Sequence, residues 1–298
     1  MSVTTGQQQW DIVTSVGVTA LAVAAARAIE TDRDDRLVED PYAAAFVAAA
    51  EAEVPMPTTR REIDELGEEG AGVWSALQVD QYMGVRTRFF DDFFDGASEA
   101  GVRQAVILAS GLDVRAQRLS WPRGAVVFEI DQPKVREFKR GVLEAQGAST
   151  SCELRQVPID LREDWASALL EAGFDTSAPT AWLAEGLLPY LPQDAQQQLL
   201  ENVDRLSARG SRLAVEDFGD LSELFRDEEM VELGKQWGVD MRELLHADDR
   251  PNAAETLAGF GWSTDSREAE KVAEDHGRSL ASFPMKGVGR FLKATKTA

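Results

Sequence analysis

Residues 104–131 constrain the fold of this chain more than any other stretch, because they predict a strand, a glycine turn, a short crossover and a second strand ending in a carboxylate. The apolar run 106–108 stops just before Gly111, where the backbone can turn sharply with a ligand close against it. A second apolar run, formed by Val126, Val127, Phe128 and Ile130, leads to Asp131, twenty positions after Gly111 (131 minus 111). In doubly wound sheets a carboxylate at this place accepts hydrogen bonds from ribose hydroxyls. The stretch therefore predicts a site for an adenosine.

The glycine turn differs from that of dinucleotide-binding folds. At the three positions of the pattern G-x-G-x-x-G the chain has Ala109, Gly111 and Val114, so two of the three glycines are missing. Those glycines let the backbone close on a pyrophosphate and let the next helix pack tightly on the strand. Their absence favours a ligand without pyrophosphate, such as S-adenosylmethionine. A single glycine after an apolar strand is also typical of any buried parallel strand, so the turn alone does not decide the matter.

Three other motifs strengthen the interpretation of the glycine turn as a binding site for S-adenosylmethionine. They are Asp160 and Leu161 in VPIDLREDW, the run TAWLAEGLLPYLP, and VRTRFFDDFF upstream of the glycine turn. In these motifs the chain resembles the leucine carboxyl methyltransferase-like family of S-adenosylmethionine-dependent enzymes, in particular its bacterial, largely actinobacterial branch. The resemblance covers most of the chain and implies an α/β fold, the mostly parallel, Rossmann-like sheet of class I methyltransferases. The family usually has glycine where this chain has Ala109, whose methyl group would crowd the cofactor.

Composition narrows the classes of partner and compartment. The net charge of −21 and the pI near 4.5 predict a surface that repels phosphate backbones and anionic lipids, which argues against nucleic-acid and membrane partners. Cys152 is the only cysteine, so we expect no disulfide, no metal-binding thiolate cluster and a reducing cytoplasm. The apolar segment 12–29 contains hydroxyl residues and lacks a basic region before it, so we expect a packed helix rather than a signal or anchor.

The chain has 298 residues, 44% of them hydrophobic, which is enough for one elaborated domain spanning 1–298. Apolar strand candidates alternate with helical stretches, which predicts a parallel sheet covered on both faces. They lie at 104–109, 125–130, 153–159, 180–184, 211–215, 260–264 and 287–293, and the resemblance implies that the last two complete the sheet. We expect a helical extension or lid (1–100), the cofactor-binding core (104–216), a helical insertion (218–256) and the terminal strands (257–298).

Residues that follow each strand are the candidates for the cofactor site, because ligands of open α/β sheets lie at the carboxyl ends of the strands. We expect Gly111 to admit the methionine part of the cofactor and Asp131 to hold the ribose. The resemblance assigns the adenine to Asp160 and Leu161, through the side-chain carboxylate and a backbone amide. Alternatively, Asp160 caps a helix that begins at Leu161, with Glu163 completing the capping pair.

Two further charged residues belong to the candidate site. The resemblance places Arg86 against the carboxylate of the cofactor, which a guanidinium group can bind with two hydrogen bonds. Alternatively, Arg86 is a surface residue paired with Asp91 or Asp92, and Arg88 is a competing candidate. Glu185 closes the fourth strand and is placed to touch the cofactor ammonium or the substrate, or instead to act as a buried acid that caps a helix.

Other charged residues near the turn have structural roles in this interpretation. Asp113 and Arg115 follow the turn, and we expect them to pair with each other or to brace the loop. Glu129 lies two residues before Asp131 on the same strand face, so we expect hydrogen bonds inside the sheet rather than a contact with ligand.

Methyl transfer from a sulfonium is an in-line displacement, in which the enzyme mainly holds nucleophile and methyl carbon together in a dry pocket. A carboxylate nucleophile is already ionised at neutral pH, which suits a chain whose two histidines, His246 and His276, lie outside the strand-end motifs. For a hydroxyl nucleophile an acidic residue or Tyr190, the candidate substrate contact, would serve as base. The sequence identifies no catalytic residue.

The leading hypothesis is therefore an S-adenosylmethionine-dependent methyltransferase that modifies a carboxylate or hydroxyl of a small molecule or peptide. The alternatives are an NAD(P)-dependent oxidoreductase on a related sheet and a cofactor-binding regulator without catalytic activity. The missing pyrophosphate glycines favour the first over the second, and turnover separates the first from the third.

Overall fold

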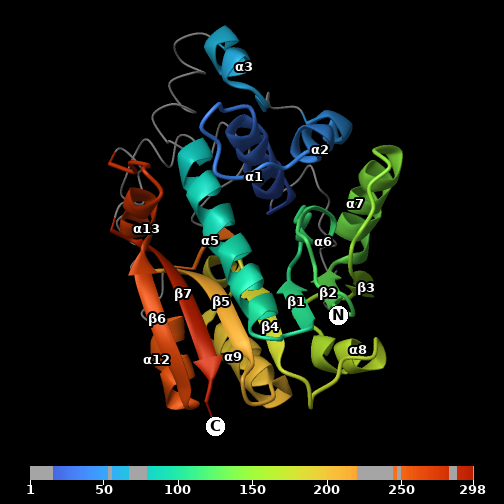
Figure 1. Cartoon of the computed structure of the whole chain (residues 1–298), viewed down its shortest axis with the longest axis vertical. Helices are drawn as coiled ribbons and strands as arrows, with labels where there is room; N and C mark the ends of the chain where they lie inside the picture. Colours follow the sequence, from blue (N-terminus) through green and yellow to red (C-terminus); the bar gives the residue numbers. More distant parts are fainter. Residues whose placement is uncertain are drawn as a thin grey trace, which may run out of the picture.

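The computed structural model describes residues 16–52, 56–66, 79–219, 244–246, 250–281 and 287–297. Helices come first in the chain, and strands and helices then alternate (Figure 1). The strands are β1 (Gln104–Leu108), β2 (Val126–Asp131), β3 (Glu153–Pro158), β4 (Thr180–Ala184), β5 (Arg212–Phe218), β6 (Trp262–Glu268) and β7 (Gly289–Lys296). The helices are α1 (Val16–Thr31), α2 (Ala43–Ala50), α3 (Arg60–Glu65), α5 (Val79–Glu99), α6 (Arg115–Arg118), α7 (Pro133–Ala145), α8 (Trp165–Glu171), the 3₁₀ helix η1 (Leu188–Tyr190), α9 (Gln193–Leu206), α12 (Ala253–Gly259) and α13 (Ala269–Asp275).

The described strands form one seven-stranded sheet in the order β3-β2-β1-β4-β5-β7-β6. The pairs from β3 to β5 are parallel, and β7 runs antiparallel to both of its neighbours. This confirms the predicted α/β fold with a mostly parallel sheet. The strand order reverses between β1 and β4, and in open α/β sheets that switch point is where ligands bind. The sequence predicted that two terminal strands complete the sheet but not that the last strand lies between β5 and β6.

Central strands contribute apolar side chains to both faces of the sheet, since successive residues of a strand point to opposite sides. Ala105 and Ile107 of β1 join the core beneath α1, α5 and α13. Val106 and Leu108 join a second core beneath α8, α9 and α12 on the other face. Burial on both faces explains why this strand reads as a continuous apolar run rather than an alternating one.

The helices α1, α2 and α3 lie beyond the carboxyl ends of the parallel strands, whereas α5 runs along one face of the sheet (Figure 1). α1 confirms the packed helix predicted from the segment 12–29 over its described part, 16–29, since Leu21, Ala25 and Ile29 are fully buried at four-residue spacing. Residues 12–15 lie outside the described residues. No helix in the described ranges is both long and apolar enough to cross a membrane. Because α1 packs against α5 and α2, it has a defined place above the edge of the sheet.

Six of the seven strands differ from their predicted bounds by one to four residues at one end or both, and only β4 has the predicted bounds. Two of these differences have a clear local cause. β1 ends at Leu108 because Ala109 has a left-handed backbone conformation, with φ of +49°, which a strand cannot contain. β5 continues to Phe218, beyond the predicted end at 215, because it pairs with β7 along its length. The start of the predicted insertion, 218–256, therefore belongs to the sheet, and most of that range lies outside the described residues.

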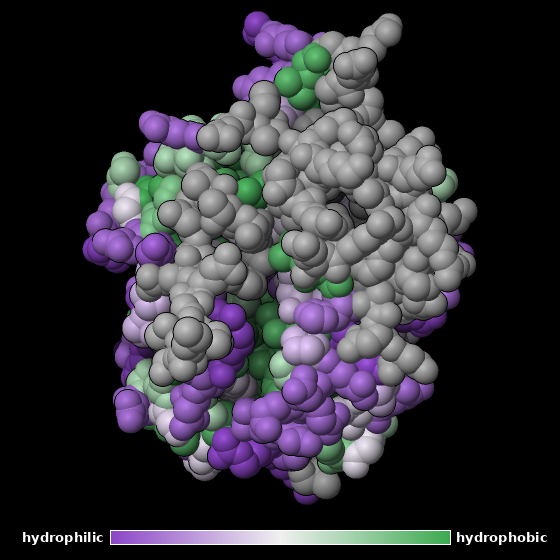
Figure 2. All heavy atoms as spheres, turned by 180° about the vertical axis from the view of Figure 1, so that it is seen from behind, coloured by the Kyte–Doolittle hydropathy of each residue, from purple (hydrophilic) through white to green (hydrophobic). Residues whose placement is uncertain are grey.

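The apolar residues are mostly enclosed in the two cores. Among the large apolar side chains that the structure describes, Leu170 alone is markedly exposed, at 41%. On the rear face, hydrophilic residues predominate over the lower part, with apolar residues visible in a narrow hollow between them (Figure 2).

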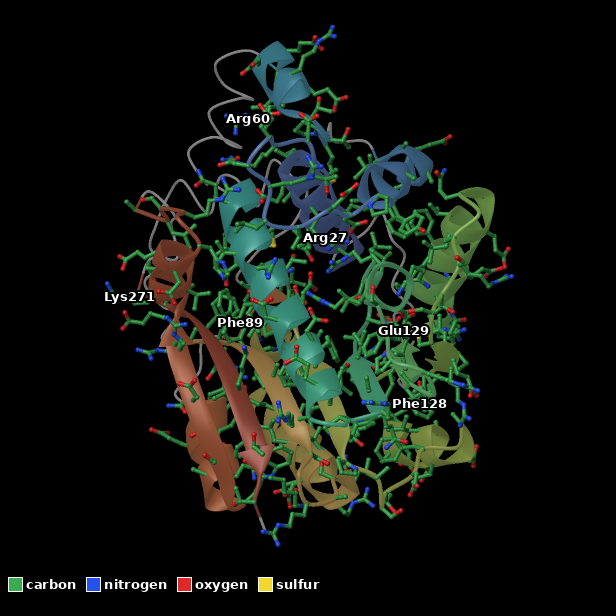
Figure 3. The ribbon with its side chains drawn as sticks, viewed as in Figure 1. Arg27, Arg60, Phe89, Phe128, Glu129 and Lys271 are labelled. Atoms are coloured by element: carbon green, nitrogen blue, oxygen red, sulfur yellow. The ribbon has the colours of Figure 1, made fainter. Side chains whose placement is uncertain are left out.

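Aromatic packing fastens α5 to the sheet. Phe291 of β7 is fully buried, and the rings of Tyr82, Phe89 and Phe90 on α5 lie around it, with centroid distances of 5.8, 5.1 and 5.6 Å. Figure 3 shows Phe89 where α5 passes the last strands. The same helix carries Arg86, so this packing also fixes the position of a candidate site residue.

Phe291→Ala should lower the free energy of unfolding by about 3–5 kcal/mol, because it leaves a large cavity between α5 and the sheet. Urea denaturation followed by circular dichroism measures the loss. Leu170→Ala is the control, since that side chain is 41% exposed, and it should cost less than about 1 kcal/mol. Equal losses in the two variants would show that the aromatic cluster does not fasten the helix.

Candidate functional site

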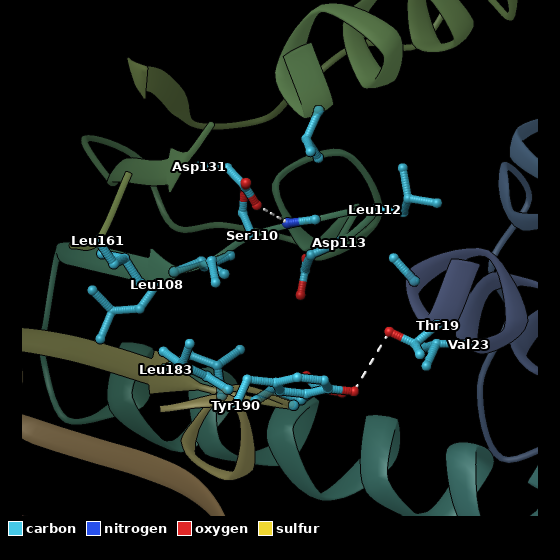
Figure 4. A pocket seen from close by; sticks show the side chains of 18 of the residues that line it. Thr19, Val23, Leu108, Ser110, Leu112, Asp113, Asp131, Leu161, Leu183 and Tyr190 are labelled. Carbon is cyan, nitrogen blue, oxygen red and sulfur yellow. Dashed lines mark hydrogen bonds between the residues drawn. The ribbon is translucent and has the colours of Figure 1, made fainter. Parts of the chain in front are cut away.

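A cavity of about 490 Å³ opens at the carboxyl ends of the parallel strands, within the size range of small-molecule sites. The turn after β1 forms one wall, and Tyr190 of η1 lies on the wall facing it (Figure 4). Leu161 lies at one end, and α1 closes the other end with Thr19 and Val23 (Figure 4). The cavity therefore occupies the strand ends that the sequence predicted as the ligand site.

The turn after β1 brings the backbone close to the cavity. Ala109 and Gly111 both have left-handed φ values, +49° and +45°. The Ser110 N–H donates to the carbonyl of Ile130 at 3.0 Å and keeps the turn against β2. Glycine adopts such values freely, whereas an alanine there is strained by about 1–2 kcal/mol. The departure from the family pattern at Ala109 therefore has an energetic cost for the backbone.

Asp131 ends β2 and presents its carboxylate to this turn. Its Oδ2 accepts a hydrogen bond from the Gly111 N–H at 2.5 Å, and its Oδ1 accepts one from the Gln132 N–H at 2.6 Å. Burial raises the pKa of Asp131 above its ordinary value, although both N–H donors oppose the shift. Each carboxylate oxygen retains a second lone pair, so the group can still accept two ribose hydroxyls.

Asp160 follows β3 and is held by two side chains. Gln132 Nε2 donates to its Oδ2 at 2.8 Å, and Arg162 Nη2 donates to the same oxygen at 2.6 Å. Burial tends to raise the pKa of Asp160, but the hydrogen bonds and charge of Arg162 lower it below its ordinary value. Asp160 and Leu161 both line the cavity, and Leu161 lies at the end away from α1 (Figure 4).

The helix-capping alternative for Asp160 is wrong. No helix begins at Leu161, because α8 begins at Trp165. The capping bond of α8 runs from the Ser167 N–H to Asp164 Oδ1, at 3.2 Å. Asp160 is therefore not needed to cap a helix.

The geometry of α5 separates the two arginines proposed for the cofactor carboxylate. Arg86 is buried, lines the cavity and contacts two carboxylates, with Nε 2.8 Å from Glu185 Oε1 and Nη1 3.0 Å from Glu216 Oε2. Arg88 lies on the exposed side of the helix and pairs with Asp92 at 2.8 Å. The surface-pair alternative therefore describes Arg88, and Arg86 is the arginine at the cavity.

Glu185 follows β4 and links two arginines instead of capping a helix. Its Oε1 faces Arg86, and its Oε2 accepts a hydrogen bond from Arg115 Nη1 at 2.6 Å. Arg115 also binds Asp113, which confirms the pair predicted to brace the turn. Arg115 Nε donates to Asp91 of α5 at 2.7 Å, so the turn, β4 and α5 are joined through one guanidinium group.

Glu129 is fully buried and is absent from the cavity wall. Its Oε2 accepts a hydrogen bond from Lys139 of α7 at 2.8 Å. The prediction that Glu129 is held by protein rather than by ligand agrees with this contact. The expected partner was wrong, because it comes from the covering helix and not from the sheet.

The part of the cavity formed by α1 and η1 is mainly apolar. Thr19 and Tyr190 add hydroxyl groups, and Tyr190 Oη donates to Thr19 Oγ1 at 3.5 Å (Figure 4). Burial raises the pKa of Tyr190 above its ordinary value, so its phenol stays protonated at neutral pH. In this state Tyr190 can orient an acceptor by a hydrogen bond.

Sequence reasoning missed several charged or titratable residues at or beside the cavity, and two of the missed residues, Glu216 and His246, bear directly on its chemistry. Glu216 is fully buried inside β5, and the one local signal was an acidic residue within an apolar strand, which demands a buried partner. His246 lines the cavity because its backbone N–H donates to the carbonyl of Pro189 in η1, at 2.8 Å. No local signal in the sequence marks that approach.

Two buried hydroxyl groups fit a polar ligand in the cavity. Ser110 Oγ and Thr87 Oγ1 belong to cavity-lining residues, are buried, and have no hydrogen-bond partner within the described ranges. A buried hydroxyl without a partner costs about 1–3 kcal/mol, which a ligand group can recover. Together with the Asp131 carboxylate they suit a nucleoside that carries an amino-acid chain. Among the residues that the structure describes, no cluster of three or more His, Cys, Asp or Glu is arranged to hold a metal ion.

A sequence profile described as leucine carboxyl methyltransferase matches residues 20–204, more than half of the 298 residues. The chain belongs to the leucine carboxyl methyltransferase family. A relative from Saccharopolyspora erythraea is 53% identical over 255 residues, 86% of each chain. Another, from Mycolicibacterium smegmatis, is 46% identical over 287 residues, 95% of this chain and 93% of its own. Both relatives are named as candidate S-adenosyl-L-methionine-dependent methyltransferases. The predicted family, enzyme class and cofactor are thereby confirmed.

The fold of the family is also found among solved structures. The crystal structure of a candidate methyltransferase from Thermobifida fusca matches with a TM-score of 0.51 and 20% identity, over 100% of both chains. At this identity the likeness concerns the fold alone, and it agrees with the Rossmann-like sheet predicted from the sequence.

Ala109→Gly should raise the free energy of unfolding by about 1 kcal/mol, because glycine adopts the left-handed conformation without strain. Urea denaturation is the measurement. Ala105→Gly makes the same exchange inside β1, where no strain is relieved, and should lower stability by about 0.5–1 kcal/mol. A loss of stability in Ala109→Gly would contradict the expected strain.

Proposed function

We propose that the protein transfers a methyl group from S-adenosylmethionine to an oxygen atom, a carboxylate or a hydroxyl, of a small molecule or peptide. The observation that best supports a site for this cofactor is a row of residues along the carboxyl edge of the sheet. In strand order, Asp160 follows β3, Asp131 ends β2, Gly111 follows β1 and Glu185 follows β4. Neighbouring strands lie about 4.8 Å apart, so the row spans about 14 Å, enough for an adenosine and an amino-acid chain.

In this proposal the order of the residues in the row gives the orientation of the bound cofactor. The adenine lies between Leu161 and Asp160, and the ribose lies on Asp131. The methionine end then reaches Arg86 and Glu185, where its carboxylate and ammonium meet charges of both signs. In this arrangement the methyl group is directed toward the mainly apolar part of the cavity formed by α1 and η1.

When bound, the cofactor supplies an electrophilic methyl group on a sulfonium sulfur. The acceptor oxygen forms a bond to the methyl carbon as the carbon–sulfur bond breaks, which leaves S-adenosylhomocysteine. The protein holds the acceptor in line and excludes water. Val23 and Leu191 line the part of the cavity near α1 and η1, where the acceptor is proposed to bind, and their apolar surface excludes water. The Tyr190 hydroxyl orients the acceptor.

A carboxylate acceptor follows from the family name and needs no base. A hydroxyl acceptor is a second candidate, and two observations favour it. His246 lines the cavity beside η1, and an imidazole can accept the proton that a hydroxyl acceptor releases on methylation. The cavity arginines also have carboxylate partners already, among them Arg27 with Asp40 at 2.8 Å, so an acidic substrate must compete for them.

Calorimetry should show that the protein binds S-adenosylmethionine and S-adenosylhomocysteine but not NAD. Asp131→Ala is the matching variant, and loss of its hydrogen bonds to ribose should weaken binding by about 1–3 kcal/mol. Burial raises the pKa of Asp131, so its carboxylate takes up a proton at a higher pH than that of an exposed aspartate. On acidification, binding should therefore begin to weaken at that higher pH. Binding of NAD alone would overturn the proposal, and full affinity in a folded Asp131→Ala variant would remove Asp131 from the site.

The acceptor class can be read from the chemistry of the product. Incubation with methyl-labelled cofactor and a metabolite extract, followed by mild base, should release the label if the acceptor is a carboxylate, because methyl esters hydrolyse and methyl ethers do not. A label stable to base excludes a carboxylate acceptor, and a methyl ether identified in the product by mass spectrometry then indicates a hydroxyl acceptor. His246→Gln should then slow transfer, whereas His276→Gln, away from the cavity wall, should not. Absence of any labelled product from a protein that binds the cofactor would favour a regulator.

A further inference from the structure

We infer that Glu216 is a positioning residue for the methionine end of the cofactor. It holds Arg86 and the Gly186 backbone, and through them Glu185, without contacting the cofactor itself. This inference rests on the proposed function, because it takes S-adenosylmethionine as the ligand of the cavity.

The contacts of Glu216 are all made with protein donors. Its Oε1 accepts a hydrogen bond from Tyr82 Oη at 2.7 Å, and its Oε2 accepts one from the Gly186 N–H at 2.7 Å. Arg86 Nη1 lies 3.2 Å from Oε1 and 3.0 Å from Oε2. Glu216 is fully buried and is not part of the cavity wall, whereas Arg86 and Gly186 are.

These contacts fix the surroundings of Glu185 on two sides. On one side lies the guanidinium of Arg86, whose Nε is 2.8 Å from Glu185 Oε1. On the other side is Gly186, the next residue in the chain, which has a left-handed φ of +59°. The Gly186 N–H donates to Glu216, so the same carboxylate determines where β4 turns away and where Arg86 lies. Loss of its charge weakens the hold on both, although Arg86 keeps its contact with Glu185.

The sheet order places this effect at one end of the ligand. β5 pairs with β4, so Glu216 extends the row of Asp160, Asp131, Gly111 and Glu185 by one strand, on the methionine side. Asp131 and Asp160 hold the adenosine, and neither contacts Glu216. A change at Glu216 should therefore be felt by the amino-acid end of the ligand and not by the adenosine end.

Two ligands separate these ends. S-adenosylhomocysteine carries the amino-acid chain, and 5′-methylthioadenosine has the same adenosine and sulfur without the ammonium and carboxylate. In calorimetry, Glu216→Gln should weaken S-adenosylhomocysteine at least about tenfold and 5′-methylthioadenosine by less than about twofold. Glu129→Gln is the matched control, an equally buried glutamate off the cavity wall, and it should leave the ratio of the two affinities unchanged.

An equal loss for both ligands, or no loss for either, would overturn the inference, because a purely structural role does not distinguish the two ends. If Glu216→Gln fails to fold, Tyr82→Phe removes one donor from Glu216 and keeps Arg86, and it should weaken S-adenosylhomocysteine alone by about threefold to tenfold. A wild-type protein that binds neither ligand would overturn the proposed function instead, which is a separate outcome.

Discussion

The buried contact between Arg86 and Glu216 ties α5 to the centre of the sheet, and the geometry of the cavity depends on it. The two residues are 130 positions apart in the chain and come from a covering helix and an interior strand. A buried charge without its partner costs about 3–5 kcal/mol, so neither element can move without unpairing the other. The position of α5 determines in turn where Thr87 and Asp91 lie.

From this contact a series of alternating charges continues through the site. Arg86 meets Glu185, Glu185 meets Arg115, and Arg115 meets Asp91, which also binds Arg118 at 2.6 Å. The series joins α5, β4 and α6 at the end of the cavity where the methionine part is proposed to bind. Groups held this way are in place before a ligand arrives, which favours binding because less freedom is lost.

The sequence predicted those parts of the fold and the site that depend on local pattern. Apolar runs predicted the strands, and Asp131 and Asp160 were found because each stands where such a run ends. Two expectations failed where side-chain partners outweighed the local signal. The helix-cap alternative for Asp160 failed because its carboxylate is held by Arg162 and Gln132, and the expected sheet partner of Glu129 is instead Lys139 of a covering helix.

The sequence contains a periodic signal that distinguishes Arg86 from Arg88, although the sequence analysis did not use it. Residues two apart on a helix point about 200° from each other, so only one of the pair can face the sheet. Tyr82, Phe89 and Phe93 share the buried face with Arg86 at helical spacing. That periodicity identifies the inward arginine once the aromatic residues are assigned to the core.

By itself, the sequence determined the alternation of strands and helices, the strand ends that line the candidate ligand site, the family and the cofactor, because these depend on residues close together in the chain. The tertiary structure alone decided that β7 lies between β5 and β6, that Glu216 pairs with Arg86, and that His246 reaches the cavity wall. Each of these depends on which distant segments share the same core. Burial and charge pairing settle that choice over the whole molecule at once, and no local pattern records it.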